Sequence, residues 1–382
     1  MYPGIRWFAK FGHNHLMADL ARRVHSRCLV ALSNLQYGNA QVPEEEAFLI
    51  IEEIEDVELF DAQLGVDPKL NVPAALQDTL FGEPEPSEEE RAQYGQDIPP
   101  MGTYAILDSA KMPYLLTAQL SGSGLEYQSL FQGITQEELK ERAPYLVKLE
   151  ESHPFIRKLF TDLDPPFGLW RKELGIFIRS RADLKTLRNH FRKFVRISDK
   201  QGKWYYFRFW EKNIMRTYGE CIYDKPERIG RWFITQEGCH IGFVVPIYEE
   251  KKFHYLYPSR KLENAMLNTP FLLGDVEIEA FTLLESHEFR VKLLKYLCEK
   301  SPLFNKQEKH RKEEIVIFII KQAEKYNIRI HKALADFSLA SVLLKSPLEN
   351  VPVLREILES DNHPLDKANL VLKHVRSSIL TP

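Results

Sequence analysis

The stretch that decides the fold runs from Leu174 to Trp210 and reads LGIFIRSRADLKTLRNHFRKFVRISDKQGKWYYFRFW. Its first residues, Leu174–Ile178, are rich in the β-branched and aromatic side chains typical of strands. Between Leu184 and Phe194 the large apolar residues recur at spacings of three and four, which predicts an amphipathic helix. A strand that leads directly into a helix predicts a sheet covered by helices.

Turn and cap signals bound this helix on both sides. Ser180 and Asp183 have the spacing of a capping box, which predicts that the helix begins near them. After the helix, Asp199–Gly202 reads Asp-Lys-Gln-Gly between two strand-like runs, and this pattern predicts a β-hairpin. The second arm of the hairpin is the aromatic run Trp204–Trp210.

The rest of the chain predicts further strands on either side of this stretch and helices at both ends. We expect strands at Tyr104–Leu107, Tyr145–Val147, Arg231–Thr235, His240–Tyr248 and Phe253–Tyr257. Amphipathic patterns predict helices at Leu16–Leu35, Glu44–Phe60, Asp275–Lys300, Gln307–Tyr326, Ile328–Leu344, Val351–Glu359 and Pro364–Ser378.

These elements predict an α/β (α+β) N-terminal lobe, with a mixed sheet flanked by helices, and an all-helical C-terminal lobe. The predicted domains are an acidic, largely helical extension at 1–100 with a Pro/Glu-rich linker at 82–100, an α/β domain at 101–222, a strand-rich connecting segment at 223–268 and a helical lobe at 269–382.

Charge is unevenly distributed along the chain, although its formal net charge is only −3. Residues 44–97 contain seventeen acidic side chains and two basic ones, whereas residues 171–216 contain fourteen basic and four acidic ones. Opposite segments of this kind either recognise charged partners, face each other within one fold or remain solvated at the surface. We favour the last two explanations.

Targeting and membrane signals do not occur in the sequence as given. The N-terminus lacks an apolar run that ends in small residues, and no stretch approaches the ~20 apolar residues that a membrane span requires. The four cysteines are far apart, which is typical of a reduced cytosolic protein. We therefore expect a cytoplasmic location and no membrane span.

The common catalytic and cofactor motifs are also missing from the sequence. There is no phosphate-binding Gly-rich loop and no H-E-x-x-H metal motif, so we expect neither a cofactor nor a metal. The best metal-like group is His13 and His15 with Asp19, which we interpret as surface residues. Asp108 and His190 are the candidate acid–base pair if the protein is a hydrolase.

The run from Trp204 to Trp210 is the strongest candidate binding element. In a strand, Trp204, Tyr206, Arg208 and Trp210 would share one face. Trp, Tyr and Arg are the residues enriched at protein–protein hot spots, and Arg188 and Arg192 lie nearby in sequence. The same residues would suit a strand buried on both faces or, less well, a nucleic-acid site formed by the basic region 171–216.

Several short stretches, taken in order, resemble a family of type VI secretion effector chaperones, the adaptors of the Tap/TEC type. The resemblance covers about residues 103–220 and rests on Tyr104–Ala110, Ser129–Phe131, Ala143–Val147, Trp170, Phe177–Ser180, Leu187–Arg192 and Phe207–Trp210. The chain departs from the family pattern at Arg171, where members often have Gly, and at Glu211, where they often have Asp.

The resemblance implies a cytosolic adaptor that binds a type VI secretion effector and helps to load it onto the VgrG spike protein. It implies no catalytic residue, and we expect no enzyme activity and no nucleic-acid partner. Within the resembling region, the residues expected to have structural roles are Asp108, Pro144, Tyr145, Trp170, His190 and Glu211. The alternatives are a hydrolase that uses Asp108 and His190, and a nucleic-acid-binding protein.

Overall fold

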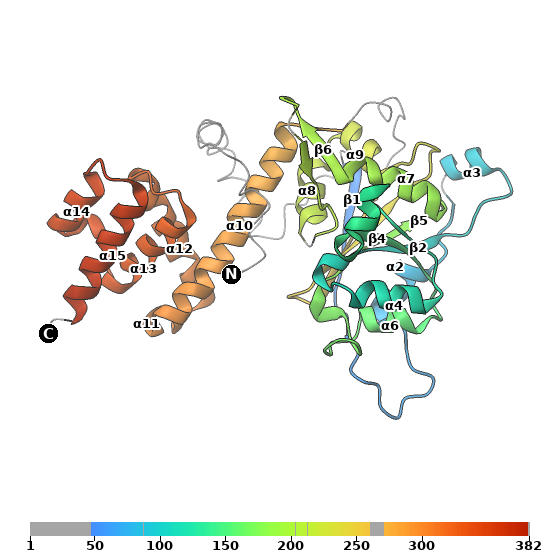
Figure 1. Cartoon of the computed structure of the whole chain (residues 1–382), viewed down its shortest axis with the longest axis horizontal. Helices are drawn as coiled ribbons and strands as arrows, with labels where there is room; N and C mark the ends of the chain where they lie inside the picture. Colours follow the sequence, from blue (N-terminus) through green and yellow to red (C-terminus); the bar gives the residue numbers. More distant parts are fainter. Residues whose placement is uncertain (1–46, 87, 203, 212, 260–270, 381–382) are drawn as a thin grey trace. The chain divides into compact units, whose positions relative to one another are not determined.

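The structure is a computed structural model that describes residues 47–380 except 87, 203, 212 and 260–270 (Figure 1). The chain forms two compact units that divide between Phe281 and Thr282, within the long helix α10 (Asp275–Lys300). The first unit is built around a mostly antiparallel sheet flanked by helices, and the second is helical. The predicted fold class is therefore confirmed.

The main sheet has seven strands, and all the pairings between its named strands are antiparallel. Its order is β1 (Leu49–Ile54), β9 (Lys252–Pro258), β8 (Gly242–Ile247), β5 (Gly175–Ser180), β2 (Gly102–Asp108), β4 (Pro144–Leu149) and β3 (Tyr127–Ser129). The predicted strands at Tyr104–Leu107, Tyr145–Val147 and Leu174–Ile178 lie next to one another at β2, β4 and β5.

A smaller sheet carries the predicted hairpin. Strand β6 (Arg196–Asp199) pairs antiparallel with β7 (Trp204–Tyr206) and parallel with β10 (Leu272–Leu273). The order β10-β6-β7 leaves the aromatic strand β7 at an edge. The hairpin prediction is confirmed, but β7 ends at Tyr206 and does not continue to Trp210.

Helices cover both faces of the main sheet in the first unit (Figure 1). The helices of the first unit up to α9 are α2 (Gln77–Phe81), α3 (Glu88–Tyr94), α4 (Leu115–Ser123), α5 (Ile134–Glu138), α6 (Pro154–Leu159), α7 (Leu184–Val195), α8 (Ile214–Ile222) and α9 (Pro226–Phe233). Adjacent residues of a strand point to opposite faces of the sheet. Phe243 and Val244 of β8 therefore point into two different packing layers, one on each face.

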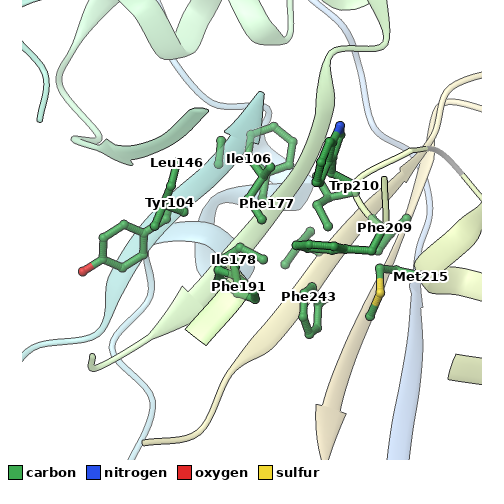
Figure 2. Packing of buried hydrophobic residues seen from close by; sticks show 14 of the residues in the cluster. Tyr104, Ile106, Leu146, Phe177, Ile178, Phe191, Phe209, Trp210, Met215 and Phe243 are labelled. Atoms are coloured by element: carbon green, nitrogen blue, oxygen red, sulfur yellow. The ribbon is translucent and has the colours of Figure 1, made fainter. Parts of the chain in front are cut away.

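Aromatic side chains fill both layers. On one face, Phe160 stacks on Phe177 of β5, which pairs with Val244, at a centroid distance of 5.4 Å. On the other face, Phe191 of α7 packs against Phe243 at 5.9 Å and against Phe209 at 5.7 Å. Figure 2 shows Phe209 and Phe243 close to Phe191 in this second layer. Helix α7 is therefore held on the sheet by its predicted apolar face.

Further sequence predictions differ from the structure. The expected helix at Glu44–Phe60 is replaced, in its described part, by strand β1, which pairs along its whole length with β9. The expected strand at Arg231–Thr235 is instead largely the last turn of helix α9. The N-cap of α7 is Asp183, whose side chain accepts a hydrogen bond from the Thr186 amide, and not Ser180. The predicted helix at Leu16–Leu35 lies outside the described residues.

The acidic segment at 82–100 was predicted to be a Pro/Glu-rich linker, and two of its carboxylates contact the end of β5. It contains helix α3, and Arg181, at the end of β5, forms ion pairs with Glu83 and Glu90. Arg179 donates hydrogen bonds to the carbonyl oxygens of Leu80 and Gly82. The acidic and basic segments thus neutralise each other here within one fold.

The second unit is a set of helices around its own apolar core. They are the rest of α10, α11 (Pro302–Asn305), α12 (Lys309–Lys325), α13 (His331–Leu344), α14 (Pro352–Glu359) and α15 (Pro364–Leu380). Phe337 of α13 and Val371 of α15 belong to one buried cluster. The sequence predicted these helices because Pro and Asn interrupt a continuous amphipathic pattern.

Gly175 allows β5 to approach β2 closely. A substitution at this position tests whether the two strands are paired as described. A Cβ atom at Gly175 would lie only 1.8 Å from the carbonyl oxygen of Ile106. We predict that Gly175→Ala lowers the free energy of unfolding by about 3 kcal/mol or more, because the backbone of β2 must move. Chemical denaturation monitored by tryptophan fluorescence measures this change.

The matched control is Gly122→Ala in α4, where an added Cβ meets no atom within 4 Å. Alanine favours a helix over glycine by up to about 1 kcal/mol, so this variant should be neutral or slightly more stable. Equal destabilisation by the two substitutions would contradict the close approach of β5 and β2.

Candidate functional site

The carboxylate of Asp108 lies at the end of β2, where the sequence placed a candidate acid. The strand ends there because the Asp108 side chain caps the following turn, and its Oδ1 accepts a hydrogen bond from the Ala110 amide at 2.9 Å. The residue is only 1% exposed. A buried carboxylate requires further donors, since an unpaired buried charge is strongly destabilising.

Two side chains from the segment after β7 supply these donors. The indole Nε1 of Trp210 donates to Asp108 Oδ2 at 2.8 Å, and the Arg208 guanidinium forms an ion pair with the same oxygen. Both donors come from about a hundred residues further along the chain. They fix the segment that follows the hairpin to the end of β2 in the main sheet.

A second carboxylate extends this cluster. Glu211 Oε1 lies 2.7 Å from Arg208 Nη2, and Glu211 Oε2 lies 2.9 Å from Lys111 Nζ. Lys111 also donates to the Glu173 carbonyl oxygen. Two cations and two carboxylates therefore compensate one another, and we call Asp108, Lys111, Arg208 and Glu211 the Asp108 cluster.

Other residues expected to be structural pack around the same part of the sheet. Pro144 begins β4 and pairs with Asp108. The Tyr145 hydroxyl donates to the Lys140 carbonyl oxygen at 2.9 Å. Trp170 is buried, with its ring centroid 4.6 Å from that of Tyr248. These contacts give each residue a place in the packing.

The predicted binding face of Trp204–Trp210 is divided in the structure. Phe207, Phe209 and Trp210 are all buried, so Trp210 belongs to the core and not to a surface (Figure 2). Regular alternation ends because the chain turns after Phe207, with the Glu211 amide donating to the Arg208 carbonyl oxygen at 2.9 Å. The same turn directs the Arg208 side chain to the Asp108 cluster.

Trp204 and Tyr206 of β7, in contrast, remain exposed. Their exposed fractions are 57% and 42%. The Arg196 guanidinium lies 4.9 Å from the centroid of the Trp204 ring, and the Tyr206 ring packs edge-on against Phe131 at 5.6 Å. Both aromatic side chains are thus oriented by neighbours while part of each remains accessible to a partner.

Arg188 joins this surface through Phe131. Its Nε donates to the Ser129 carbonyl oxygen at 2.7 Å, and its Nη2 donates to the Phe131 carbonyl oxygen at 3.1 Å. Burial and the nearby charge of Arg192 lower the pKa of Arg188. We call Arg188, Arg192, Arg196, Trp204 and Tyr206 the β7 patch.

His190 lies on the buried side of α7 and has a structural partner. Its ring nitrogen Nε2 donates to the Trp232 carbonyl oxygen at 3.1 Å, and its ring packs edge-on against Phe191 and Phe194. Burial lowers the pKa of His190 to about 4, so the ring is neutral at pH 7. Asp108 is bonded to other groups, and the two candidate residues of a hydrolase share no partner.

Two hollows of the described structure differ in size and lining. A cavity of about 10 Å³ lined by Leu107, Trp170 and Tyr248 has barely the volume of one water molecule. A more open hollow of about 390 Å³ has a charged lining that includes Glu55, Glu58 and Lys252, and neither Asp108 nor His190 lines it. Within the described ranges, no group of three His, Cys, Asp or Glu side chains is placed to hold a metal ion. The sequence candidates His13, His15 and Asp19 lie outside those ranges.

Sequence reasoning did not identify Lys111 or Phe131 as parts of this region. Lys111 is a single exposed-looking cation in a turn, and no local pattern connects it with Glu211. Phe131 belongs to the stretch Ser129–Phe131, which contributes to the family resemblance. Its contact with Tyr206 nevertheless joins residues 75 positions apart in the sequence. Such contacts depend on strand order, which local patterns do not determine.

Comparison with known proteins places both groups within one matched region. Residues 103–228, about a third of the chain, match the model of a family described as Domain of unknown function (DUF4123). The match includes the Asp108 cluster and the β7 patch. No curated protein and no solved structure matches the chain.

The Asp108 cluster can be tested by a substitution that conserves shape. We predict that Asp108→Asn lowers the free energy of unfolding by roughly 3 kcal/mol, because an amide NH₂ would oppose one of the donors from Ala110, Arg208 or Trp210. Chemical denaturation provides the measurement.

Asp164→Asn is the matched control, since Asp164 pairs with Arg171 at 3.4 Å while its side chain is 87% exposed. Exposed pairs contribute at most about 1 kcal/mol. If the two substitutions cost the same, Asp108 does not organise the fold as described.

Proposed function

We propose that this protein is a cytosolic adaptor of type VI secretion that binds an effector and helps to load it onto the VgrG spike protein. The observation that carries the proposal is the β7 patch, an exposed aromatic and basic surface on a braced hairpin within the matched region. The sequence resemblance described above supplies the classes of partner.

The physical argument starts from the exposed rings. An exposed Trp and Tyr on one strand present apolar area whose removal from water favours association. Arg196 and Phe131 restrict the rings before any partner arrives, which reduces the entropy lost on binding. Trp, Tyr and Arg are also the residues that contribute most often to protein–protein affinity.

None of the helices in the described structure combines the length and apolar character that crossing a membrane requires. The cytosolic location is part of the proposal, and it follows from the role of an adaptor that meets its effector before export.

The hydrolase alternative has less support from the geometry. Asp108 and His190 are both buried, and each forms hydrogen bonds with different partners. An acid and a base that act on one substrate must both reach it within hydrogen-bond distance. We therefore propose a binding function and no catalysis.

The proposal predicts that Trp204→Ala/Tyr206→Ala loses a specific protein partner. The tagged wild-type protein, isolated from a type VI-positive Gram-negative host, should co-purify with a VgrG protein or a toxin-like effector identified by mass spectrometry. Loss of two anchors should reduce recovery at least tenfold, since about 1.4 kcal/mol corresponds to a factor of ten.

Phe167→Ala provides the control, because Phe167 is 75% exposed on the same unit but lies outside the β7 patch. It should leave recovery unchanged. Recovery of neither partner class by the wild type, or equal recovery by the double variant, would contradict the proposed function.

A further inference from the structure

Three arginines of the β7 patch lie at four-residue intervals along α7 and into β6, and we call them the arginine stripe. Arg188 and Arg192 are one helical turn apart on α7, and Arg196 follows four residues later at the start of β6. Residues four apart on a helix are neighbours on one face, and like charges at this spacing repel. The stripe therefore concentrates positive charge beside Trp204 and Tyr206.

Within the described chain, none of these three guanidinium groups forms an ion pair with a carboxylate. Arg188 donates to two backbone carbonyl oxygens, and Arg196 lies over the Trp204 ring. Other arginines of the same unit do form ion pairs with carboxylates. Arg181 pairs with Glu83 and Glu90. Arg208 pairs with Asp108 and Glu211. The stripe thus retains charge that a partner can neutralise.

The lowered pKa of Arg188 also indicates that this surface favours an anionic partner. Burial and the charge of Arg192 lower the pKa of Arg188, so the positive charges of the two groups destabilise each other. A carboxylate placed between them would remove part of this repulsion and add charge-assisted hydrogen bonds. An anionic partner is therefore favoured at this surface over a neutral one.

We propose that the β7 patch binds an acidic polypeptide segment that also carries apolar side chains. Its carboxylates would pair with Arg192 and Arg196, and its apolar side chains would pack against Trp204 and Tyr206. The inference rests on the proposed function and names the chemistry of the partner segment. The stripe and the exposed rings are adjacent, because Arg196 and Tyr206 are cross-strand partners.

A polypeptide fits this surface better than a nucleic acid does. Nucleotide bases bind such sites by stacking on aromatic rings, but Arg196 already lies over the Trp204 ring. The Nε and Nη2 donors of Arg188 are committed to the Ser129 and Phe131 carbonyl oxygens, which leaves fewer donors for phosphates.

Fluorescence anisotropy tests the inference directly on the full chain. The probes are a short labelled peptide of alternating Glu/Asp and Phe/Leu, its counterpart with Lys at every acidic position, and a single-stranded oligothymidine. The wild-type protein should bind the acidic peptide, and this binding should weaken with salt because partly exposed charges are screened. It should bind the lysine peptide at least tenfold more weakly.

Charge reversal at Arg192→Glu/Arg196→Glu should weaken binding of the acidic peptide by about 30-fold, the factor that corresponds to about 2 kcal/mol. The matched control is Arg329→Glu/Lys332→Glu, which makes the same change in net charge at two exposed cations of the second unit and should leave affinity within about twofold. Arg192→Gln/Arg196→Gln gives an independent variant without added carboxylates, and it should also lose affinity.

The possible outcomes separate this inference from the proposed function. Equal binding of the acidic and lysine peptides, tighter binding of the oligothymidine, or no binding of the acidic peptide would overturn the inference. If the charge-reversed protein still recovers the protein partner that Trp204→Ala/Tyr206→Ala loses, the adaptor function stands and the acidic segment is excluded. If the wild type recovers no such partner, the proposed function itself fails.

Discussion

The structure of the first unit depends on satisfying one buried carboxylate, that of Asp108. Its two oxygens accept from the Ala110 amide, the Trp210 indole and the Arg208 guanidinium, so the turn after β2 and the segment after β7 must meet at the same place. Removing Arg208 would leave the carboxylate charge without this partner in the core, and removing either neutral N–H donor would leave part of a buried acceptor unsatisfied. The cluster thereby fixes where the hairpin emerges from the main sheet.

The surface properties follow from this constraint. Because Trp210 and Phe209 are packed in the core, the chain leaves the β6–β7 ladder after Tyr206, and only Trp204 and Tyr206 of the aromatic run remain exposed. The same packing holds α7 against the sheet, so that its arginine stripe continues into β6 beside those rings. A rigid core thus presents a small aromatic and basic surface, which is the arrangement that our functional proposal uses.

The sequence was sufficient where structure follows from local pattern. The strands around Ile106, Leu146 and Ile176, helix α7 and the helices after Asp275 have periodicities that their own side chains determine. The sequence was not sufficient where a distant part of the chain determines the structure. Residues 49–54 form a strand because β9 provides an edge with which they pair. Trp210 is buried because its indole donates to Asp108. The pairing of Arg181 with Glu83 and Glu90 likewise joins residues that no local pattern relates. Of the candidate site, the residue types at Trp204, Tyr206, Arg188 and Arg192 were foreseen, but their separation from Arg208 and Trp210 was not.

The central claim is that the β7 patch is the surface on which this protein receives a partner. Amide hydrogen exchange of the protein, alone and in complex with the co-purified partner, measures this claim most directly. We predict that binding protects the backbone of the β6–β7 hairpin and the last turn of α7, because a partner covers them. Unchanged exchange in these segments, with protection confined to the helices of the second unit, would contradict the account.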